Sequence, residues 1–426
     1  MSDTTKKIHV EDENTGQPEA TEQASTTTEQ TIKDEKVKVV TRDEPETMTE
    51  RLVESATKRN IRYAVVGLGY IAQVAVLPAF QHAQENSELV ALVSDDEVKR
   101  KQLAKKYKVR KTYSYEQFGD CLASGEVDAV YIALPNNMHR AYTEGAAAAG
   151  VHVLCEKPMA VTEQECEAMI EACNRAKVKL MVAYRLHFEA GNLNAMAAVR
   201  DGRIGDARIF NSEFCQQVVE GNTRLRAELG GGPLYDIGVY CINAARYLFR
   251  TEPEEVFAYG ATNKNDARFR EVQEMSGAVM RFPGDRLATF TCSFGAAERS
   301  AYEVIGTKGV LKMDPAYEMV GDLKCEIITK DGKPQKKTYK KRDQFGPELV
   351  YFSKCILGDR EPEPNGLEGL ADVRVIRALL ESQEQNKPVR ISPVKDLARP
   401  SEEQEMHKPP IEEPPLVKAT APSKQG

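Results

Sequence analysis

The chain of 426 residues has no tryptophan and only 6 histidines. No stretch approaches the roughly 20 consecutive apolar residues that span a bilayer. The amino terminus has neither an apolar core nor a twin arginine, so it does not resemble an export signal. We therefore expect a cytoplasmic protein with no membrane partner. The histidines never fall at i, i+4 with a third ligand nearby, so we expect no protein-bound metal ion.

The nine cysteines are scattered, without a Cys-x-x-Cys pair. An odd number at irregular spacing indicates reduced thiols rather than a disulfide framework. Of 65 acidic and 58 basic residues, 13 and 6 lie in residues 1–50, which leaves 52 of each for the rest of the chain. A neutral body without a basic stripe argues against a nucleic-acid partner.

Composition divides the chain into four regions. Residues 1–58 are rich in Thr, Glu, Gln and Lys and predict a disordered acidic leader, because such a segment cannot bury enough apolar surface to offset the entropy of ordering. Prolines and charges concentrate in residues 395–426, which predicts an extended, solvated, disordered tail. We interpret both ends as flexible segments without a function of their own. A subunit-clasping arm is the alternative for the leader.

Residues 59–183 alternate strand and helix patterns. Short apolar runs begin at Tyr63, Leu89, Ala129, Val151 and Leu180, and helical stretches lie between them, notably over 97–107 and 140–149. Such runs indicate buried parallel strands in βαβ units. This region therefore predicts a domain built on a parallel sheet of βαβ units.

Residues 184–394 have a different pattern. A helix-like segment at 234–249 is followed by strand candidates at 254–260, 277–282, 288–293, 302–305, 309–313 and 325–329. Two late helices are expected at about 348–356 and 368–383. Runs of strands predict one large, mostly antiparallel open sheet in an α/β domain.

A glycine-rich turn follows the first predicted strand, in the order Gly67, Leu68, Gly69, Tyr70, Ile71 and Ala72. The first glycine permits a tight turn, and the second lets the backbone approach a pyrophosphate at a helix amino terminus. The motif is weak alone. Its place after a strand and at the head of a βαβ series makes it a dinucleotide site, and Tyr70 and Ile71 are counted with it.

The end of the second strand predicts which dinucleotide binds. An acidic residue at this tip would bind a ribose diol and repel a 2′-phosphate. Here Ser94 stands at the tip and Lys99 lies one turn into the next helix, so a hydroxyl and a cation favour NADP. NAD is the alternative if Asp95 occupies the tip instead.

Two further strand ends carry polar residues. The strand that begins at Ala129 is followed by Leu134, Pro135, Asn136 and His139, where the nicotinamide end of a cofactor would pass. An ordinary helix-start residue is the alternative for His139. Glu156 and Lys157 end the next strand, and Lys157 would supply a fixed positive charge to orient a hydroxyl and support a neighbouring phenol.

Three glycines, Gly230 to Gly232, precede a predicted helix. If this helix starts near Leu234, Asp236 and Tyr240 are four residues apart and Asn243 follows, so all three share one face. A carboxylate, a phenol and an amide in one stripe suit recognition and deprotonation of a polyol. The alternative is a capped helix with Tyr240 in the core.

Taken in order, these motifs resemble the Gfo/Idh/MocA oxidoreductases, most closely their glucose–fructose oxidoreductase branch, over about residues 60–392. The resemblance rests on Gly67-x-Gly69, Leu134–His139, Glu156-Lys157-Pro158, Tyr184–Glu189 and Gly230–Tyr240. It implies a Rossmann domain, a second α/β domain, bound NADP(H), and hydride exchange with a sugar carbon. It also implies a homodimer or homotetramer formed through the second domain's sheet.

Carried over by motif, Lys157 is the catalytic lysine, Tyr240 is the general acid/base, and Asp236 is the polar residue paired with it. Ser94 and Lys99 fall where that branch contacts the 2′-phosphate. Arg224 corresponds to a cofactor-side arginine. Arg185, within the Tyr184–Glu189 motif, and Glu156 are also expected at the cofactor.

The sequence departs from the branch at two places. Thr223 stands where the branch has a tryptophan, and the leader lacks the export signal and the proline-rich arm of the branch's periplasmic member. The leading hypothesis is a cytoplasmic NADP-dependent enzyme that oxidises an aldose at C1 to a lactone. A ketone- or dihydrodiol-type oxidoreductase is the first alternative, and a non-catalytic NADP-binding regulator is the second.

Overall fold

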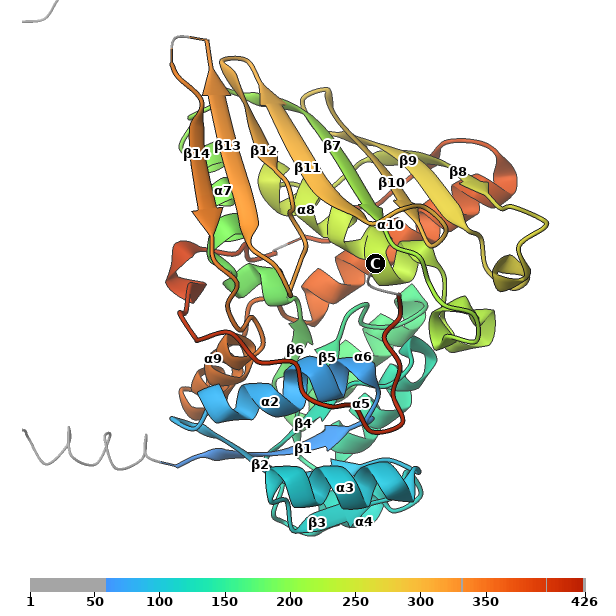
Figure 1. The fold of residues 1–426 in the computed structure, drawn as a ribbon, viewed down its shortest axis with the longest axis vertical. Helices are drawn as coiled ribbons and strands as arrows, with labels where there is room; N and C mark the ends of the chain where they lie inside the picture. Colours follow the sequence, from blue (N-terminus) through green and yellow to red (C-terminus); the bar gives the residue numbers. More distant parts are fainter. Residues whose placement is uncertain (1–58, 331, 396, 424–426) are drawn as a thin grey trace, which may run out of the picture. The chain divides into compact units, whose positions relative to one another are not determined.

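The computed structural model describes residues 59–330, 332–395 and 397–423, so the leader expected over 1–58 lies outside the described residues. Two sheets organise the chain (Figure 1). Sheet A has six strands, and sheet B has nine. The predicted α/β fold, with a parallel Rossmann sheet and a second, mostly antiparallel sheet, is confirmed.

Sheet A is parallel throughout and has the strand order β3-β2-β1-β4-β5-β6 of doubly wound dinucleotide-binding folds. Its strands are β1 (Ile61–Val66), β2 (Ser87–Val93), β3 (Lys111–Tyr113), β4 (Ala129–Ile132), β5 (His152–Glu156) and β6 (Leu180–Ala183). Five of them coincide with the predicted apolar runs. The sequence analysis missed β3, because its three residues include none that is buried.

Both faces of sheet A are covered, and β1 shows why its sequence is almost wholly apolar. Tyr63 and Val65 pack on one face, while Ala64 and Val66 pack on the other. The first face is covered by η1 (Ala72–Val76), α2 (Leu77–Ala79), η2 (Phe80–His82), α3 (Glu97–Tyr107) and α9 (Gly346–Leu357). The second face is covered by α4 (Phe118–Ala123), α5 (His139–Ala148) and α6 (Glu163–Ala176).

Sheet B has the order β14-β13-β12-β11-β7-β10-β9-β8-β15 and is antiparallel except for the pair β7 and β10. Its strands are β7 (Ala207–Cys215), β8 (Glu255–Ala261), β9 (Met275–Phe282), β10 (Arg286–Ser293), β11 (Arg299–Gly306), β12 (Gly309–Met313), β13 (Leu323–Thr329), β14 (Gln335–Tyr339) and β15 (Val389–Arg390). The helices α7 (Ala190–Arg200), α8 (Val239–Phe249) and α10 (Gly366–Gln385) cover one face (Figure 1).

Short helical turns connect these elements. They are η3 (Asn136–Met138), η4 (Arg185–Phe188), η5 (Thr223–Leu225), η6 (Ala227–Leu229), the π-helical η7 (Leu234–Gly238), η8 (Ala267–Phe269) and η9 (Glu402–Gln404). Several of them carry residues of the site described below.

Helix α9, which lies within residues 184–394, packs on β1 and β2 of sheet A. A buried polar joint fixes it there. The Ser353 hydroxyl lies 2.8 Å from the Tyr63 hydroxyl and 2.7 Å from that of Ser87. The chain therefore returns to the first sheet after completing most of the second.

The carboxyl-terminal segment contacts the body of the protein. Residues 397–423 have little regular secondary structure. Four of the segment's apolar side chains pack against the core on the face of sheet A that η1, α2 and η2 cover: Met406, Ile411, Leu416 and Val417. Proline-rich composition excludes regular structure, but it does not exclude docking of spaced apolar side chains.

The helices among the described residues are all too short or too polar to cross a lipid bilayer. All nine cysteines lie within the described residues as free thiols, and eight of them are buried.

Candidate functional site

A cleft of about 550 Å³ lies at the carboxyl ends of the strands of sheet A, where doubly wound folds bind their ligands. The ends of β1, β2, β4, β5 and β6 form one wall. The end of β7, the η5–η6 loop and the start of the η7–α8 helix form the other. Fifteen predicted residues line it: Gly67, Gly69, Tyr70, Ile71, Ser94, Lys99, Leu134, Pro135, Asn136, Glu156, Lys157, Arg185, Arg224, Asp236 and Tyr240.

Two residues predicted to bind cofactor do not line this cleft. Ala72 is fully buried in the π-helical segment behind the glycine turn. His139 is also fully buried, and its ring nitrogens lie 2.9 Å from the Leu134 carbonyl oxygen and 3.1 Å from that of Pro158. His139, the first residue of α5, therefore holds together two loops of the cleft wall. Burial lowers the pKa of its ring.

The glycine turn is shaped to admit a pyrophosphate. Gly67 has a φ of +93°, and a Cβ there would lie 2.5 Å from the Ala133 carbonyl oxygen, so the turn requires glycine. A Cβ on Gly69 would have no heavy atom within 4 Å, so the backbone there is open on the side that faces the cleft. The helical stretch begins at Tyr70, directly after this cradle. These features fit a dinucleotide cofactor.

The end of β2 resolves the choice between Ser94 and Asp95. Ser94 lines the cleft, whereas the Asp95 carboxylate accepts a 2.7 Å hydrogen bond from the Tyr115 backbone N–H at the end of β3. Asp96 caps α3 by accepting from the Lys99 backbone N–H at 3.1 Å, which fixes the turn that carries Lys99. Tyr115, which the sequence analysis did not identify, also lines the cleft.

Lys157, Asp236 and Arg224 form a charged cluster on the floor of the cleft. The Lys157 ammonium donates to the Asp236 backbone carbonyl at 2.7 Å and lies 3.5 Å from Asp236 Oδ1. Arg224 Nε donates to Asp236 Oδ2 at 2.7 Å, and Gln216 Nε2 donates to the same oxygen at 3.1 Å. The motifs predicted the first three residues, but Gln216 follows β7 and carried no signal.

The Asp236 carboxylate is held in its charged form. Burial alone would raise its pKa, but Arg224 and Lys157 outweigh that penalty and lower the pKa below its usual value. The nearby Glu156 carboxyl behaves differently, because burial raises its pKa even though it accepts a 2.9 Å hydrogen bond from the Tyr131 hydroxyl, which favours the charged form. The site therefore keeps one firmly ionised carboxylate beside its lysine.

Tyr240 is surrounded by cations and aromatic rings. The Lys157 ammonium lies 4.7 Å from the Tyr240 ring centroid, over the ring rather than at its hydroxyl. Arg185 reaches the hydroxyl instead, with its Nε donating to the Tyr240 oxygen at 3.3 Å. Phe214 and Tyr317 pack around this ring, with centroids 5.4 and 5.9 Å away, and both line the cleft. The sequence analysis missed these two aromatic residues.

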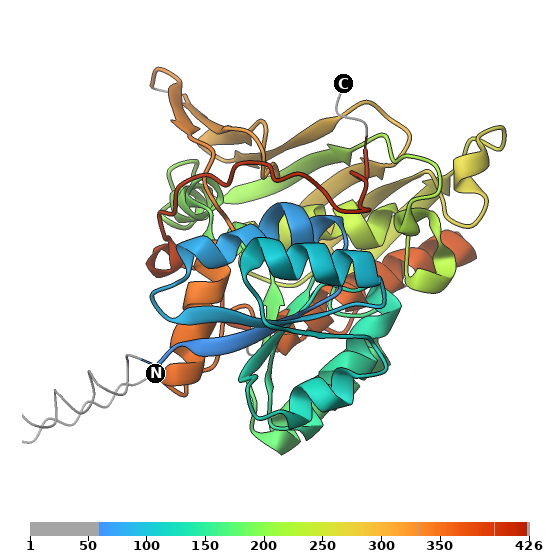
Figure 2. The same ribbon diagram turned by 60° about the horizontal axis from the view of Figure 1, so that its bottom comes forward.

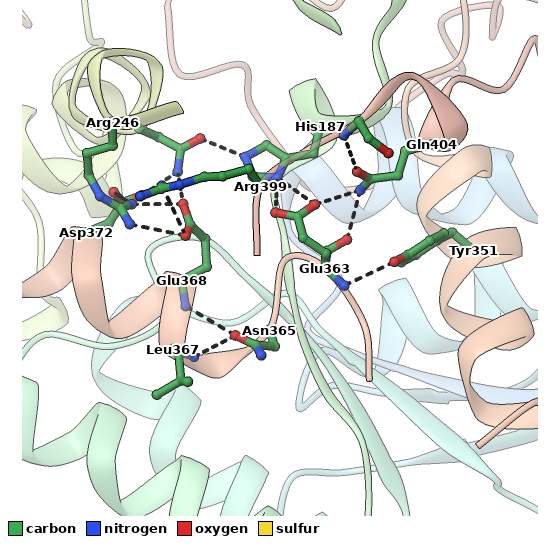
Figure 3. A network of polar contacts seen from close by, with 12 residues as sticks. His187, Arg246, Tyr351, Glu363, Asn365, Leu367, Glu368, Asp372, Arg399 and Gln404 are labelled. Atoms are coloured by element: carbon green, nitrogen blue, oxygen red, sulfur yellow. Dashed lines mark hydrogen bonds and ion pairs between the residues drawn. The ribbon is translucent and has the colours of Figure 1, made fainter. Parts of the chain in front are cut away.

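Asn243 does not join Asp236 and Tyr240 as the helical spacing suggested. The helix is π-helical over Leu234–Gly238, which shifts the register of its faces. Asn243 lies in a buried polar network, where its Oδ1 accepts a hydrogen bond from His187 Nε2 at 2.8 Å and its Nδ2 donates to Asp372 at 3.0 Å. Figure 3 shows His187 and Asp372 of this network. Its amide positions α8 and does not face the cleft.

A glycine cradle at the edge of a doubly wound sheet, with a lysine and a tyrosine lining the same cleft, is the arrangement of a nicotinamide-dependent oxidoreductase. Comparison with known proteins specifies the family. The family model described as "Oxidoreductase family, NAD-binding Rossmann fold" matches residues 61–184, and the model "GFO/IDH/MocA C-terminal domain" matches residues 192–312. The chain belongs to the Gfo/Idh/MocA oxidoreductase family, which confirms the resemblance seen in its motifs.

Among curated relatives, the D-xylose 1-dehydrogenase [NADP(+)] of Haloarcula marismortui is 33% identical, and the match covers 79% of this chain and 95% of that protein. Among solved structures, the aldose-aldose oxidoreductase from Caulobacter crescentus is 39% identical, with a TM-score of 0.75, over 78% of this chain and 100% of that chain. The 3-ketoreductase KijD10 from Actinomadura kijaniata is 26% identical, with a TM-score of 0.69, over 76% and 98% of the two chains.

Proposed function

We propose that this chain is an NADP-dependent sugar oxidoreductase that oxidises an aldose at C1 to a lactone. The carrying observation is the cluster of Lys157, Arg185 and Tyr240, which lines the same cleft as the glycine cradle. The similarity to proteins named as D-xylose 1-dehydrogenase and aldose-aldose oxidoreductase supports an aldose as the substrate class.

The residues that would hold NADP are those of the cradle and of the β2 end. Gly67 and Gly69 leave room for the pyrophosphate, and Ser94 with Lys99 would receive the ribose 2′-phosphate. The Asp95 carboxylate is engaged with the Tyr115 backbone, so it is not placed to favour an unphosphorylated ribose. When bound, the nicotinamide supplies a hydride acceptor at the sugar carbon.

The protein's own part of the reaction is to orient the sugar and move a proton. Tyr240 accepts the proton of the C1 hydroxyl, and Arg185, 3.3 Å from the phenol oxygen, stabilises the negative charge required there. Lys157 adds positive charge over the ring, and Asp236 holds both Lys157 and Arg224 in place. Phe214 and Tyr317 pack around the Tyr240 ring and hold it in place.

The test is the absorbance of reduced nicotinamide after the purified chain is mixed with NADP and a panel of aldoses and polyols. We expect steady NADPH formation with at least one aldose, together with its lactone. The proposal is wrong if NADP binds but no aldose is oxidised.

Reduction of a ketone is the second candidate, favoured by the likeness to the 3-ketoreductase KijD10 and, at 28% identity over 60% of this chain, to a trans-1,2-dihydrobenzene-1,2-diol dehydrogenase from Danio rerio. The same Tyr240 would then donate a proton instead of accepting one. Consumption of NADPH with ketones or oxidation of trans-diols, without aldose oxidation, would select this candidate. Binding of NADP without any turnover would select a regulator.

We further propose a cytoplasmic homodimer or homotetramer joined through sheet B. Ile209, Leu287, Val279 and Tyr259, on β7, β10, β9 and β8, are 39%, 45%, 41% and 63% exposed. The strand register places them on one face of the sheet, opposite α8 and α10. Exposed apolar side chains among polar ones, on a sheet face opposite the helices, suit a subunit interface. The nine free thiols suit a reducing compartment.

A further inference from the structure

We propose that residues 404–423, here called the strap, complete the cofactor site by crossing the open side of the cleft and slowing cofactor release. The proposal rests on the NADP site proposed above, and it assigns a role to a segment that the sequence analysis left without one. Figures 1 and 2 show this segment, in dark red, running past α2 to the side of sheet B.

The strap is firmly anchored where it begins. The Gln404 side chain is 5% exposed and donates to the Glu363 backbone carbonyl at 2.9 Å and to the Glu363 carboxylate at 2.7 Å. Just before it, Arg399 donates to Glu252 at 2.6 Å. Figure 3 shows that Arg399 and Gln404 join the same buried network as Arg246 of α8. Detaching this end would break several buried hydrogen bonds, so we expect it to stay docked when the remainder of the strap moves.

The middle of the strap is fastened to the glycine turn itself. The Gln73 amide is almost fully buried and makes two hydrogen bonds with the backbone of Val417, donating to its carbonyl at 2.9 Å and accepting from its N–H at 2.8 Å. The same amide donates to the Leu68 carbonyl at 2.9 Å, between the two glycines of the cradle. The strap and the pyrophosphate turn are therefore held by one side chain.

The far end bridges to the opposite wall of the cleft. The Val219 backbone N–H donates to the Pro422 carbonyl at 2.9 Å, and Ser423 forms an isolated antiparallel bridge with Val218. Ala421, Pro422 and Ser423 themselves line the cleft. A segment fastened to the cradle at Val417 and to the η5 side at Pro422 spans the two walls, and a dinucleotide lying between them has the strap over it.

Charge at this crossing also fits a phosphorylated ribose. The Lys418 ammonium lies 3.5 Å from the Asp96 carboxylate, at the start of the helix that carries Lys99. It offsets the acidic residue next to the expected 2′-phosphate. Lys418 is more than half exposed, so this contact contributes little energy by itself and can open readily.

The geometry divides the strap into a fixed part and a gate. Residues 404–417 have the buried anchor, the apolar packing and the Gln73 hydrogen bonds. Residues 418–423 have the Lys418–Asp96 ion pair, the backbone contacts of Pro422 and Ser423, and a 3.1 Å hydrogen bond from the Ser423 hydroxyl to Glu298. We expect residues 418–423 to detach for cofactor exchange while 404–417 remain docked.

A reversible cross-link tests the gate. Val218→Cys and Ser423→Cys, combined on a Cys215→Ser background to prevent mispairing, place two thiols at an antiparallel bridge where a disulfide can form. NADPH is bound before oxidation, and its release is followed by fluorescence after dilution into excess NADP. We expect release at least about tenfold slower in the oxidised protein than in the reduced one. Each single-cysteine variant is the control and should show no redox effect.

A shortened chain tests the opposite change. A variant that ends at Val417 should release NADPH about tenfold faster or more, with little loss of Tm because the Gln404 anchor remains. A variant that ends at Ser423 is the matched control and should behave as the full chain does. Unchanged release in both the cross-linked and the shortened proteins would overturn the strap.

The two proposals fail in different ways. An enzyme that oxidises aldoses while its NADPH release ignores the strap variants would contradict the strap alone. A protein whose NADPH release follows the strap, but which oxidises no aldose, would contradict the proposed reaction alone. Failure to bind NADPH would contradict both.

Discussion

At the scale of one residue, the ring and the hydroxyl of Tyr240 are held by different neighbours. Its ring is fixed by Phe214, Tyr317 and the Lys157 ammonium, while its hydroxyl accepts a 3.3 Å hydrogen bond from Arg185. The motif predicted a lysine close to a phenol. It did not predict that the lysine would face the ring and an arginine the oxygen, because that depends on contacts between distant parts of the chain, such as Arg185 with Tyr240.

Replacement of the hydroxyl alone tests the proton transfer. Tyr240→Phe keeps the ring and its packing, so we expect kcat for aldose oxidation to fall by about 10²–10⁴ while NADP affinity stays the same. Steady-state kinetics and NADPH fluorescence measure the two quantities. Tyr142→Phe, on α5 outside the cleft, is the matched control. Full activity in Tyr240→Phe would remove this residue from the mechanism.

At the scale of an element, α3 is predicted to set cofactor choice. Its N-cap Asp96 fixes the first turn, and Lys99 on that turn lines the cleft beside Ser94. We expect Lys99→Ala to weaken NADP binding about 10- to 100-fold and to leave NAD binding nearly unchanged, because only NADP carries the 2′-phosphate. Lys101→Ala, on the same helix but paired with Glu97 at the surface, is the control. Equal losses for both dinucleotides would argue against this role.

A buried ion pair joins the η4 turn to the segment before α10. Burial by itself lowers the pKa of His187, but Glu363, 3.0 Å away, outweighs this and raises it above the usual value. A raised pKa in the folded state stabilises the fold fully below about pH 6.5, and the benefit is lost as pH rises through the folded value.

Because the fold raises the pKa of His187, the loss of stability on replacing this residue should depend on pH. His187→Gln should lower the free energy of unfolding more at pH 6 than at pH 9, by on the order of 1 kcal/mol. Urea titrations at the two pH values measure it. His152→Gln is a control of opposite sign, because burial lowers the pKa of His152 and its charged form is disfavoured in the fold. A cost for His187→Gln that is larger at pH 9 would contradict the assignment.

Elements with a strong local pattern were predictable. The five apolar parallel strands and the helix at 97–107 were correctly located, because continuous burial and a capped helix can both be recognised from a few adjacent residues. Strand β7 was missed although it lies inside sheet B, since its sequence mixes Arg208, Asn211 and Glu213 with apolar residues. Its pairing with β10 and β11 comes from distant parts of the chain.

At the scale of the whole molecule, the uncovered face of sheet B predicts assembly. If that face is the subunit interface, Leu287→Asp places a charge among exposed apolar side chains and should convert the oligomer to a monomer. Light scattering measures the mass. Val98→Asp, at an exposed apolar position on α3, should leave the mass unchanged. A monomeric parent chain would contradict the proposed interface.

The sequence by itself determined the fold class and the family, and it predicted that Lys157, Asp236 and Tyr240 belong to one site, because each lies in a short motif that can be read locally. Only the tertiary structure decided the rest. It placed Ser94 rather than Asp95 at the cleft, moved Asn243 and His139 into buried contacts, and brought Gln216 and the strap to the site. The physical reason is that these positions depend on contacts between residues up to some 350 apart in the chain, such as Gln73 with Val417, which no local pattern contains.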